Sequence, residues 1–254
     1  MTDDALLAVL SDAAGAVRAA LDDLGDWGLA GTRAGQYRSD LAADRVALAV
    51  LRGAGLGVLS EESGPHDIDR DIVVALDPVD GSTNADLGLP WFATSVCAVD
   101  ARGARAALVV NQATGERFEA VRGGGALRNG QPTGPSSCTR VDAAVLGLNG
   151  YPPAYMGWRQ MRALGAAALD LCAVACGHLD GYVDCSTHAH SPWDYLGGML
   201  VCQEAGAAVA DAAGRDLLTM GWADRRVPVA AATPELLAEL LAARGGFPVP
   251  AGAG

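Results

Sequence analysis

Two acidic residues three positions apart, Asp77 and Asp80, give the first indication of chemistry in this 254-residue chain. They lie in the segment LDPVDGSTN. An apolar run at residues 72–76 predicts a strand that ends at Asp77, and Pro78 disfavours helix there. Residues 81–84 look like a helix start, whose free N–H groups suit a phosphate. This pattern fits Mg²⁺-assisted phosphoryl chemistry, although a capped turn with incidental acids has the same spacing.

Two further acidic sites lie at the ends of predicted elements. Glu61, in SEES, follows a strand expected at residues 57–59. Asp194 is in the first turn of a helix expected at residues 193–205, where it could also serve only as a cap worth about 1 kcal/mol. Together with Asp77 and Asp80 these residues offer four carboxylates, the ligand type that Mg²⁺ prefers. The sequence therefore predicts a magnesium site built from separate segments.

The elements that must position these carboxylates are short strands and amphipathic helices. The strands in the first half cluster and predict an antiparallel sheet, whereas those in the second half alternate with helices. Asn129-Gly130 is a hairpin-turn signal. We expect a single domain over residues 1–254, with an α+β lobe over about 1–140 and an α/β lobe over about 141–245. The helices are expected at residues 3–24, 40–52, 159–176, 193–205 and 234–244. Strands are expected at residues 57–59, 72–76, 93–99, 106–110, 116–121, 145–148, 181–184, 209–211 and 227–231.

Composition narrows the class of protein. The chain has 18 basic and 30 acidic residues, a net charge of −12, and 50% hydrophobic residues. All of the basic residues are Arg. This apolar content excludes a disordered chain. The strong acidity argues against a nucleic-acid polymer or an anionic membrane as partner, but bound cations would still let the protein take a small anion.

The sequence also indicates a compartment. The start, MTDDALLAVLSDAAG, is acidic where a secretory signal is basic, and no apolar run approaches the roughly 20 residues of a membrane-spanning helix. The 6 Cys residues form no CxxC pair, and Cys172 and Cys176 have the spacing of buried thiols on one helical face. We therefore expect a cytoplasmic protein.

Taken together, these motifs resemble the inositol monophosphatase family, within the lithium-sensitive, metal-dependent phosphatase superfamily. LDPVDGSTN resembles the first family signature and WDYLGGMLVCQEAGA the second. SEES precedes the first signature, and RALGAAALDLCAVACGHLDGYVD resembles the segment upstream of the second. The resemblance extends over about residues 5–245. It implies a layered α-β-α-β-α sandwich of the α+β class, as in inositol monophosphatase and fructose-1,6-bisphosphatase. It also implies a homodimer and hydrolysis of a phosphomonoester with two or three Mg²⁺ ions.

The resemblance also implies roles for individual residues. Ser82 would bind phosphate and help to activate the attacking water, with Asp44 as the acidic partner of that water. Asp184 would contact substrate hydroxyls. The metal ligands would be Glu61, Asp77, the Val79 carbonyl, Asp80 and Asp194, of which Glu61 and Asp77 also count as catalytic and Asp80 and Asp194 also face the substrate. The phosphate and substrate pocket would include the backbone N–H groups of Gly81, Ser82 and Thr83, together with Gly165, Ala166 and Ala167.

Several positions depart from the family pattern and leave alternatives open. Asp44 lacks the usual preceding Val-Thr, and Asp40 is an alternative partner for the water or a third metal. The family often has a Lys upstream, for which Arg38 is a possible substitute. Two His residues, 188 and 190, could contact substrate, bind metal or form plain surface. Arg162 could face the substrate or pair with an interior carboxylate.

The metal ligands would recognise only the phosphate group, so they do not identify the rest of the substrate. Inositol monophosphate or a similar small polyol phosphate is the leading expectation. Histidinol phosphate, fructose 1,6-bisphosphate, 3′-phosphoadenosine 5′-phosphate and a specialised cyclitol or sugar phosphate are alternatives. A non-catalytic regulator that keeps the fold is a further alternative, but such a protein is expected to lose a metal carboxylate, and all four are present.

Overall fold

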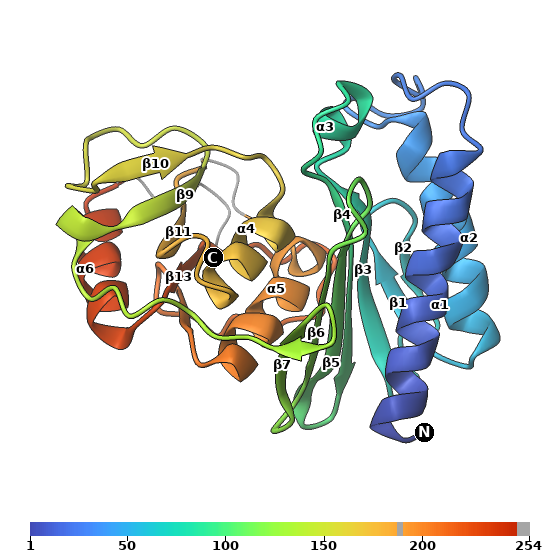
Figure 1. Ribbon diagram of the computed structural model, residues 1–254. Helices are drawn as coiled ribbons and strands as arrows, with labels where there is room; N and C mark the ends of the chain where they lie inside the picture. Colours follow the sequence, from blue (N-terminus) through green and yellow to red (C-terminus); the bar gives the residue numbers. More distant parts are fainter. Residues whose placement is uncertain (187–189, 248–254) are drawn as a thin grey trace.

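The computed structural model describes residues 1–186 and 190–247 and has five layers (Figure 1). Two helices cover the outer face of a large sheet, two more lie between this sheet and a second one, and a final helix covers the far face of the second sheet. The expected α-β-α-β-α sandwich is thus confirmed. Each sheet buries both faces, so the apolar side chains lie in separate layers of core.

The large sheet has 8 strands in the order β2-β1-β3-β4-β5-β6-β7-β8. Its neighbouring strands are antiparallel except for β1 and β3, which are parallel. The expected hairpin is confirmed: Asn129 and Gly130, with φ of 51° and 74°, form the two-residue turn between β7 and β8. The strands are β1 (Gly57–Ser60), β2 (Gly64–His66), β3 (Val73–Asp80), β4 (Ala93–Asp100), β5 (Gly103–Asn111), β6 (Arg117–Val121), β7 (Gly125–Arg128) and β8 (Gln131–Pro132).

The second sheet has 5 strands in the order β10-β9-β11-β13-β12. Strand β9 is parallel to both of its neighbours, whereas β13 is antiparallel to β11 and β12. The strands are β9 (Val145–Asn149), β10 (Gln160–Arg162), β11 (Gly181–Asp184), β12 (Ala208–Asp211) and β13 (Pro228–Ala231).

The helices begin where the sequence supplies capping groups. Thr2 and Thr233 accept backbone N–H groups at the starts of two helices, and Pro234 occupies the first turn of the second. The α-helices are α1 (Asp3–Asp22), α2 (Arg38–Gly53), α3 (Ser82–Asp86), α4 (Ala167–Ala175), α5 (Pro192–Ala205) and α6 (Pro234–Gly245), and a 3-10 helix spans Val141–Ala143. Among the described residues, no helix combines the length and apolar character needed to cross a membrane.

The helix expected at residues 159–176 is wrong over its first part. Residues 160–162 form the edge strand β10, and the helix begins only at Ala167. Gly165 has a φ of +86°, a left-handed conformation that interrupts a helix. The apolar residues before this glycine belong to a strand and a loop, so their spacing does not indicate a helix.

Helix α5 is the element that joins the layers, because it packs on β4 and β5 of the large sheet and on β12 of the second. Two adjacent glycines allow α5 to pack closely against β4 and against α4. A Cβ atom on Gly197 would lie 2.6 Å from Ser95 Oγ, and one on Gly198 would lie 2.6 Å from Leu171 Cβ. Helix α5, which carries Asp194 in its first turn, is therefore held close to the face of the large sheet. The expected division into two lobes near residue 140 stays a prediction. Helices α4 and α5, from the second half of the chain, pack against the large sheet that the first half forms.

Candidate active site

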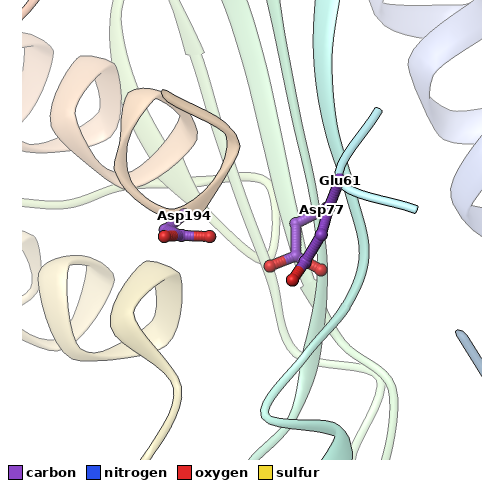
Figure 2. A group of neighbouring side chains, drawn as sticks. All are labelled: Glu61, Asp77 and Asp194. Carbon is purple, nitrogen blue, oxygen red and sulfur yellow. The ribbon is translucent and has the colours of Figure 1, made fainter. Parts of the chain in front are cut away.

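Glu61 and Asp77 lie side by side because β1 and β3 run parallel. Ser60 pairs with Leu76, and the Glu61 N–H group donates to the Leu76 carbonyl at 3.1 Å. The next residue on each strand is then an acid. Figure 2 shows both side chains leaving neighbouring backbone segments and pointing to the same region.

A bulge in β3 explains how Asp77 and Asp80 can serve one site. Asp77 pairs with Ser95 and Asp80 with Ala93, so β3 has one more residue than β4 in this interval. Side chains alternate between the faces of a strand, and residues three apart would otherwise point to opposite faces. Asp77 Oδ1 accepts the Val79 N–H group at 3.0 Å, which stabilises the turn.

Asp194 reaches the same place from the first turn of α5. The carboxylate caps this helix, because Oδ2 accepts the Ser191 N–H group at 2.8 Å. One oxygen from each of Glu61, Asp77 and Asp194 lies within 4.8 Å of the others (Figure 2). Asp80 faces the same cavity, and its Oδ2 accepts the Ala168 N–H group at 2.7 Å. The four predicted carboxylates are thus brought together.

These acids surround a cavity of about 310 Å³. Its lining includes Arg33, Asp40, Glu61, Glu62, Asp77, Val79, Asp80, Gly81, Ser82, His190 and Asp194. A larger hollow, of about 480 Å³, lies beside the C-terminal half of α5, but its half-buried arginines already pair with acids, Arg122 with Asp100 and Arg215 with Asp211. The smaller, acidic cavity is therefore the candidate active site.

The cavity concentrates negative charge that its ion pairs, Arg33 with Glu62 and His190 with Asp194, neutralise only in part. Among the residues that the structure describes, Glu61, Asp77 and Asp80 have no ion-pair partner. Burial, and then the neighbouring carboxylates, raise the pKa of Glu61 and of Asp77 well above the usual range. The same two causes raise the pKa of Asp80 to about 7. Clustered hard oxygens with this electrostatic cost fit a divalent cation such as Mg²⁺.

These raised pKa values predict how the stability of the metal-free protein depends on pH. The folded chain binds more protons than the unfolded chain, so its free energy of unfolding falls as pH rises from the unfolded pKa of Asp80, near 3.8, through about 7. In EDTA, we expect a lower Tm at pH 8.5 than at pH 5.5, and Mg²⁺ should raise the Tm at pH 8.5 by binding the native form. Calorimetry at both pH values tests this; a higher Tm at pH 8.5 in EDTA would contradict it.

The turn between β3 and α3 contains the residues for which the sequence predicts a phosphate cradle. Gly81 has a φ of +86°, and a Cβ there would lie 3.0 Å from the Trp91 carbonyl and 3.1 Å from both Ala166 Cβ and the Gly165 carbonyl. Ser82 lines the cavity. Thr83 is exposed, and its hydroxyl lies 3.2 Å from the Tyr37 hydroxyl. The buried residues Ala166 and Ala167 therefore pack behind the cradle.

Gly81→Ala should be destabilising for two reasons, strain and steric overlap. Gly88→Ala is a matched control, since Gly88 has a φ of +71° but open space around a Cβ. The left-handed conformation costs each variant about 1–2 kcal/mol, and the overlap should add at least about 1 kcal/mol in Gly81→Ala only. Urea denaturation measures both free energies of unfolding. Equal losses would show that the close approach at Gly81 has no energetic consequence.

Asp40, rather than Asp44, reaches the cavity. Asp40 lies in the first turn of α2 and accepts the Tyr37 N–H group at 2.8 Å, and burial raises its pKa to about 7. Asp44 lies one turn further along and accepts the Ser60 hydroxyl at 2.5 Å. The cavity lining does not include Asp44. Asp40, the alternative raised above, therefore lines the cavity, and the catalytic role expected for Asp44 stays a prediction.

Asp184 is fully buried and outside the cavity lining, and the substrate contact expected of it stays a prediction. The His190 ring lies between two carboxylates, with Nδ1 3.2 Å from Asp194 Oδ2 and Nε2 3.9 Å from Asp184 Oδ1. Asp184 Oδ1 accepts from Asn149 at 3.0 Å. Arg162 is exposed on β10 and donates to its neighbours Met161 and Gln160. The structure thus leaves Arg162 away from the cavity, and residue His188 lies outside the described residues.

Positive charge comes from Arg33, which the sequence analysis missed. Arg33 lines the cavity and pairs with Glu62 at 2.9 Å, whereas Arg38 pairs with Asp26 outside it. The only available sign was that glycines flank Arg33 two residues away on each side. Gly31 and Gly35 both have positive φ, which turns this segment back towards the acids.

Comparisons with known proteins identify the family. The family model described as the inositol monophosphatase family matches residues 40–245. The fructose-1,6-bisphosphatase of Pyrococcus furiosus is 31% identical over 207 residues, which are 80% of each chain. The Nus factor SuhB of Escherichia coli K12 is 34% identical over 174 residues, 62% of this chain and 63% of that protein.

Solved structures extend the likeness over nearly the whole chain. A Pyrococcus horikoshii protein described as similar to inositol-1 monophosphatase has a TM-score of 0.86 and 25% identity, over 95% of this chain and 99% of its own. The inositol monophosphatase of Anabaena (Nostoc) sp. PCC 7120 has a TM-score of 0.80 and 26% identity, over 96% and 97%. With its fold, its acidic cavity and the family match, the chain belongs to the inositol monophosphatase family.

Proposed function

We propose that this protein is a Mg²⁺-dependent phosphatase that hydrolyses inositol monophosphate or a similar small polyol phosphate. One observation carries the proposal: oxygens of Glu61, Asp77 and Asp194 lie within 4.8 Å of one another, beside the turn that begins α3. The family match supports phosphate-ester hydrolysis as the class of reaction. The cluster offers carboxylate ligands for the metal ions that this hydrolysis would use. The substrate class rests on the family name and on the modest size of the cavity.

The acidic cluster would hold two or three Mg²⁺ ions. The ligands would be Glu61, Asp77, the Val79 carbonyl, Asp80 and Asp194. When bound, Mg²⁺ makes water more acidic and neutralises charge that develops on the phosphoryl group. Li⁺ inhibition is a further expectation from the superfamily.

The remaining chemistry belongs to the chain itself. The N–H groups of Gly81, Ser82 and Thr83 would bind the phosphate oxygens, because the first N–H groups of a helix have no partner within it. The Ser82 hydroxyl would orient the attacking water. Asp40, whose pKa of about 7 suits proton transfer near neutral pH, would accept its proton. Arg33 would balance phosphate charge at the cavity wall.

Other phosphomonoesters remain alternatives within the same chemistry. The Pyrococcus furiosus relative is named a fructose-1,6-bisphosphatase, and Arg33 would suit a second phosphate. Histidinol phosphate, 3′-phosphoadenosine 5′-phosphate and a cyclitol or sugar phosphate also fit a cavity of about 310 Å³. A cytoplasmic homodimer with no nucleic-acid or membrane partner stays part of the proposal.

A regulator without catalysis is the second candidate, because several relatives are named Nus factor SuhB. Against this candidate, all four carboxylates are present and converge on one cavity. Carboxylates whose pKa is raised by burial and by mutual repulsion cost stability, so their presence together in one cavity favours a site that uses them.

A phosphate-release assay tests the proposal. The panel contains inositol 1-phosphate, glycerol 2-phosphate, fructose 1,6-bisphosphate, histidinol phosphate and 3′-phosphoadenosine 5′-phosphate, each with Mg²⁺ and with EDTA. We expect Mg²⁺-dependent turnover, fastest with inositol 1-phosphate. Another substrate far ahead would correct the substrate class, and no turnover with any of them would overturn the proposal in favour of the regulator.

A further inference from the structure

His190 connects Asp194 with the buried interior of the second sheet. Its backbone pairs with Arg226 through two hydrogen bonds, of 2.7 and 2.8 Å, which fix the main chain at this point. Its ring lines the acidic cavity, and the side chain is only 12% exposed. The backbone pairing and the enclosed ring together define where the imidazole nitrogens lie.

Both ring nitrogens have partners. Nδ1 lies 3.2 Å from Asp194 Oδ2, and Nε2 lies 2.8 Å from the Tyr182 hydroxyl and 3.1 Å from Asn149 Nδ2. Neither nitrogen is therefore available as a metal ligand or for a hydrogen bond to substrate. This arrangement argues for an indirect role, in which His190 acts through Asp194.

The partners show which nitrogen carries a proton. The Asn149 amide nitrogen donates to Asp184 Oδ1 at 3.0 Å, and its second N–H group points to His190 Nε2. The opposite amide orientation would place two oxygens together. Asn149 therefore favours the neutral ring with its proton on Nδ1, and a charged ring would also carry a proton there. In either state, His190 donates to Asp194.

Two donors consequently hold the same oxygen of Asp194. Oδ2 accepts from His190 Nδ1 and from the Ser191 N–H group at 2.8 Å. Among the described residues, no donor to Oδ1 is found, so we infer that Oδ1 is the oxygen free to bind a cation with Glu61 and Asp77. Outer hydrogen bonds of this kind orient metal-binding carboxylates, and losing one commonly weakens metal affinity by about 10–100-fold.

We propose that His190 is a positioning residue that orients Asp194 for cation binding, with Asn149 linking this pair to Asp184. The inference rests on the proposed function, since it presupposes that Asp194 binds a divalent cation. It assigns the ring neither a direct contact with the cation nor a proton-transfer step.

Two variants of His190 separate this role from simple packing. In His190→Asn the shorter amide can place an N–H group where Nδ1 lies, whereas in His190→Gln the longer amide reaches the position of Nε2. Mn²⁺ binding to the metal-stripped protein, followed by electron paramagnetic resonance, gives a readout that needs no turnover. We expect His190→Gln to raise the Mn²⁺ Kd by about tenfold or more and His190→Asn to stay within about threefold of wild type.

A third variant covers the case in which a substitution at residue 190 disturbs folding. Asn149→Ala removes the donor to Nε2 but leaves the ring, and it should weaken Mn²⁺ binding in the same direction by a smaller factor. Melting curves in EDTA identify any variant that does not fold. Unchanged Mn²⁺ affinity in folded His190→Gln, or equal weakening in both His190 variants, would overturn the positioning role.

The wild-type protein separates this inference from the proposed function. If it hydrolyses phosphomonoesters while His190→Gln binds Mn²⁺ as tightly as wild type, only the inference fails. If it binds Mn²⁺ and shows the expected order among the variants but hydrolyses nothing, only the proposed function fails. If it binds no Mn²⁺, both fail.

Discussion

Asp77→Asn should reduce kcat for phosphate release by about 10³-fold or more. Asp77 is 3% exposed at the centre of the acidic cluster, and a lost metal ligand removes several kcal/mol of stabilisation from the transition state, at 1.36 kcal/mol per tenfold in rate. The fold should persist, because the asparagine oxygen can still accept the Val79 N–H group. The measurement is single-substrate kinetics at saturating Mg²⁺.

The stability of Asp77→Asn should change in the opposite direction from its activity. Burial and the neighbouring acids raise the pKa of Asp77, so removing its charge should raise the Tm of the metal-free protein at pH 8. Asp69→Asn, on the exposed segment before β3, is the matched control and should change neither quantity. Near-wild-type turnover in Asp77→Asn would remove this residue from the metal site.

The second large effect concerns Asp40 and Asp44, which lie one turn apart on α2. Asp40→Asn should lower kcat by about 10²-fold or more, because it removes a proton acceptor from the cavity. Asp44→Asn should instead lower the free energy of unfolding by about 1–2 kcal/mol, since it weakens the buried hydrogen bond from Ser60.

Kinetics and urea denaturation of both variants test this division. Asparagine at position 40 can still accept the Tyr37 N–H group, so the start of α2 should survive. Asp44→Asn should keep kcat within about threefold of wild type, as expected for a residue with no proton-transfer role. A greater loss of activity in Asp44→Asn than in Asp40→Asn would return the catalytic role to Asp44.

Local sequence signals predicted the carboxylates at the centre of the site. Glu61 and Asp77 each follow a short apolar run. The two residues lie side by side because β1 and β3 pair in parallel. Asp194 follows a helix start that its own capping bond stabilises. Each acid therefore lies within a few residues of the strand end or helix start that predicted it, whereas the approach of Glu61 to Asp77 needs the pairing of β1 with β3.

The structure departs from the sequence expectations where contacts between distant segments determine a residue's position. Asp40 and Asp44 share one helical face, and the hydrogen bond from Ser60, at the end of β1, fixes Asp44 while Asp40 lines the cavity. Asp184 is fully buried on β11 and accepts a hydrogen bond from Asn149, which lies on the neighbouring strand β9. Residues 160–162 form a strand because β9 pairs with them, a contact that their own pattern does not contain.

The dependence of activity on a divalent cation tests the central claim most directly. The protein is stripped with EDTA, transferred to metal-free buffer and assayed for phosphate release from inositol 1-phosphate while Mg²⁺ is titrated back. We predict no turnover without Mg²⁺, full recovery on its return, and no recovery in Asp77→Asn at the same concentrations. Full turnover by the stripped protein would contradict the account, because the clustered carboxylates would then have no part in the reaction.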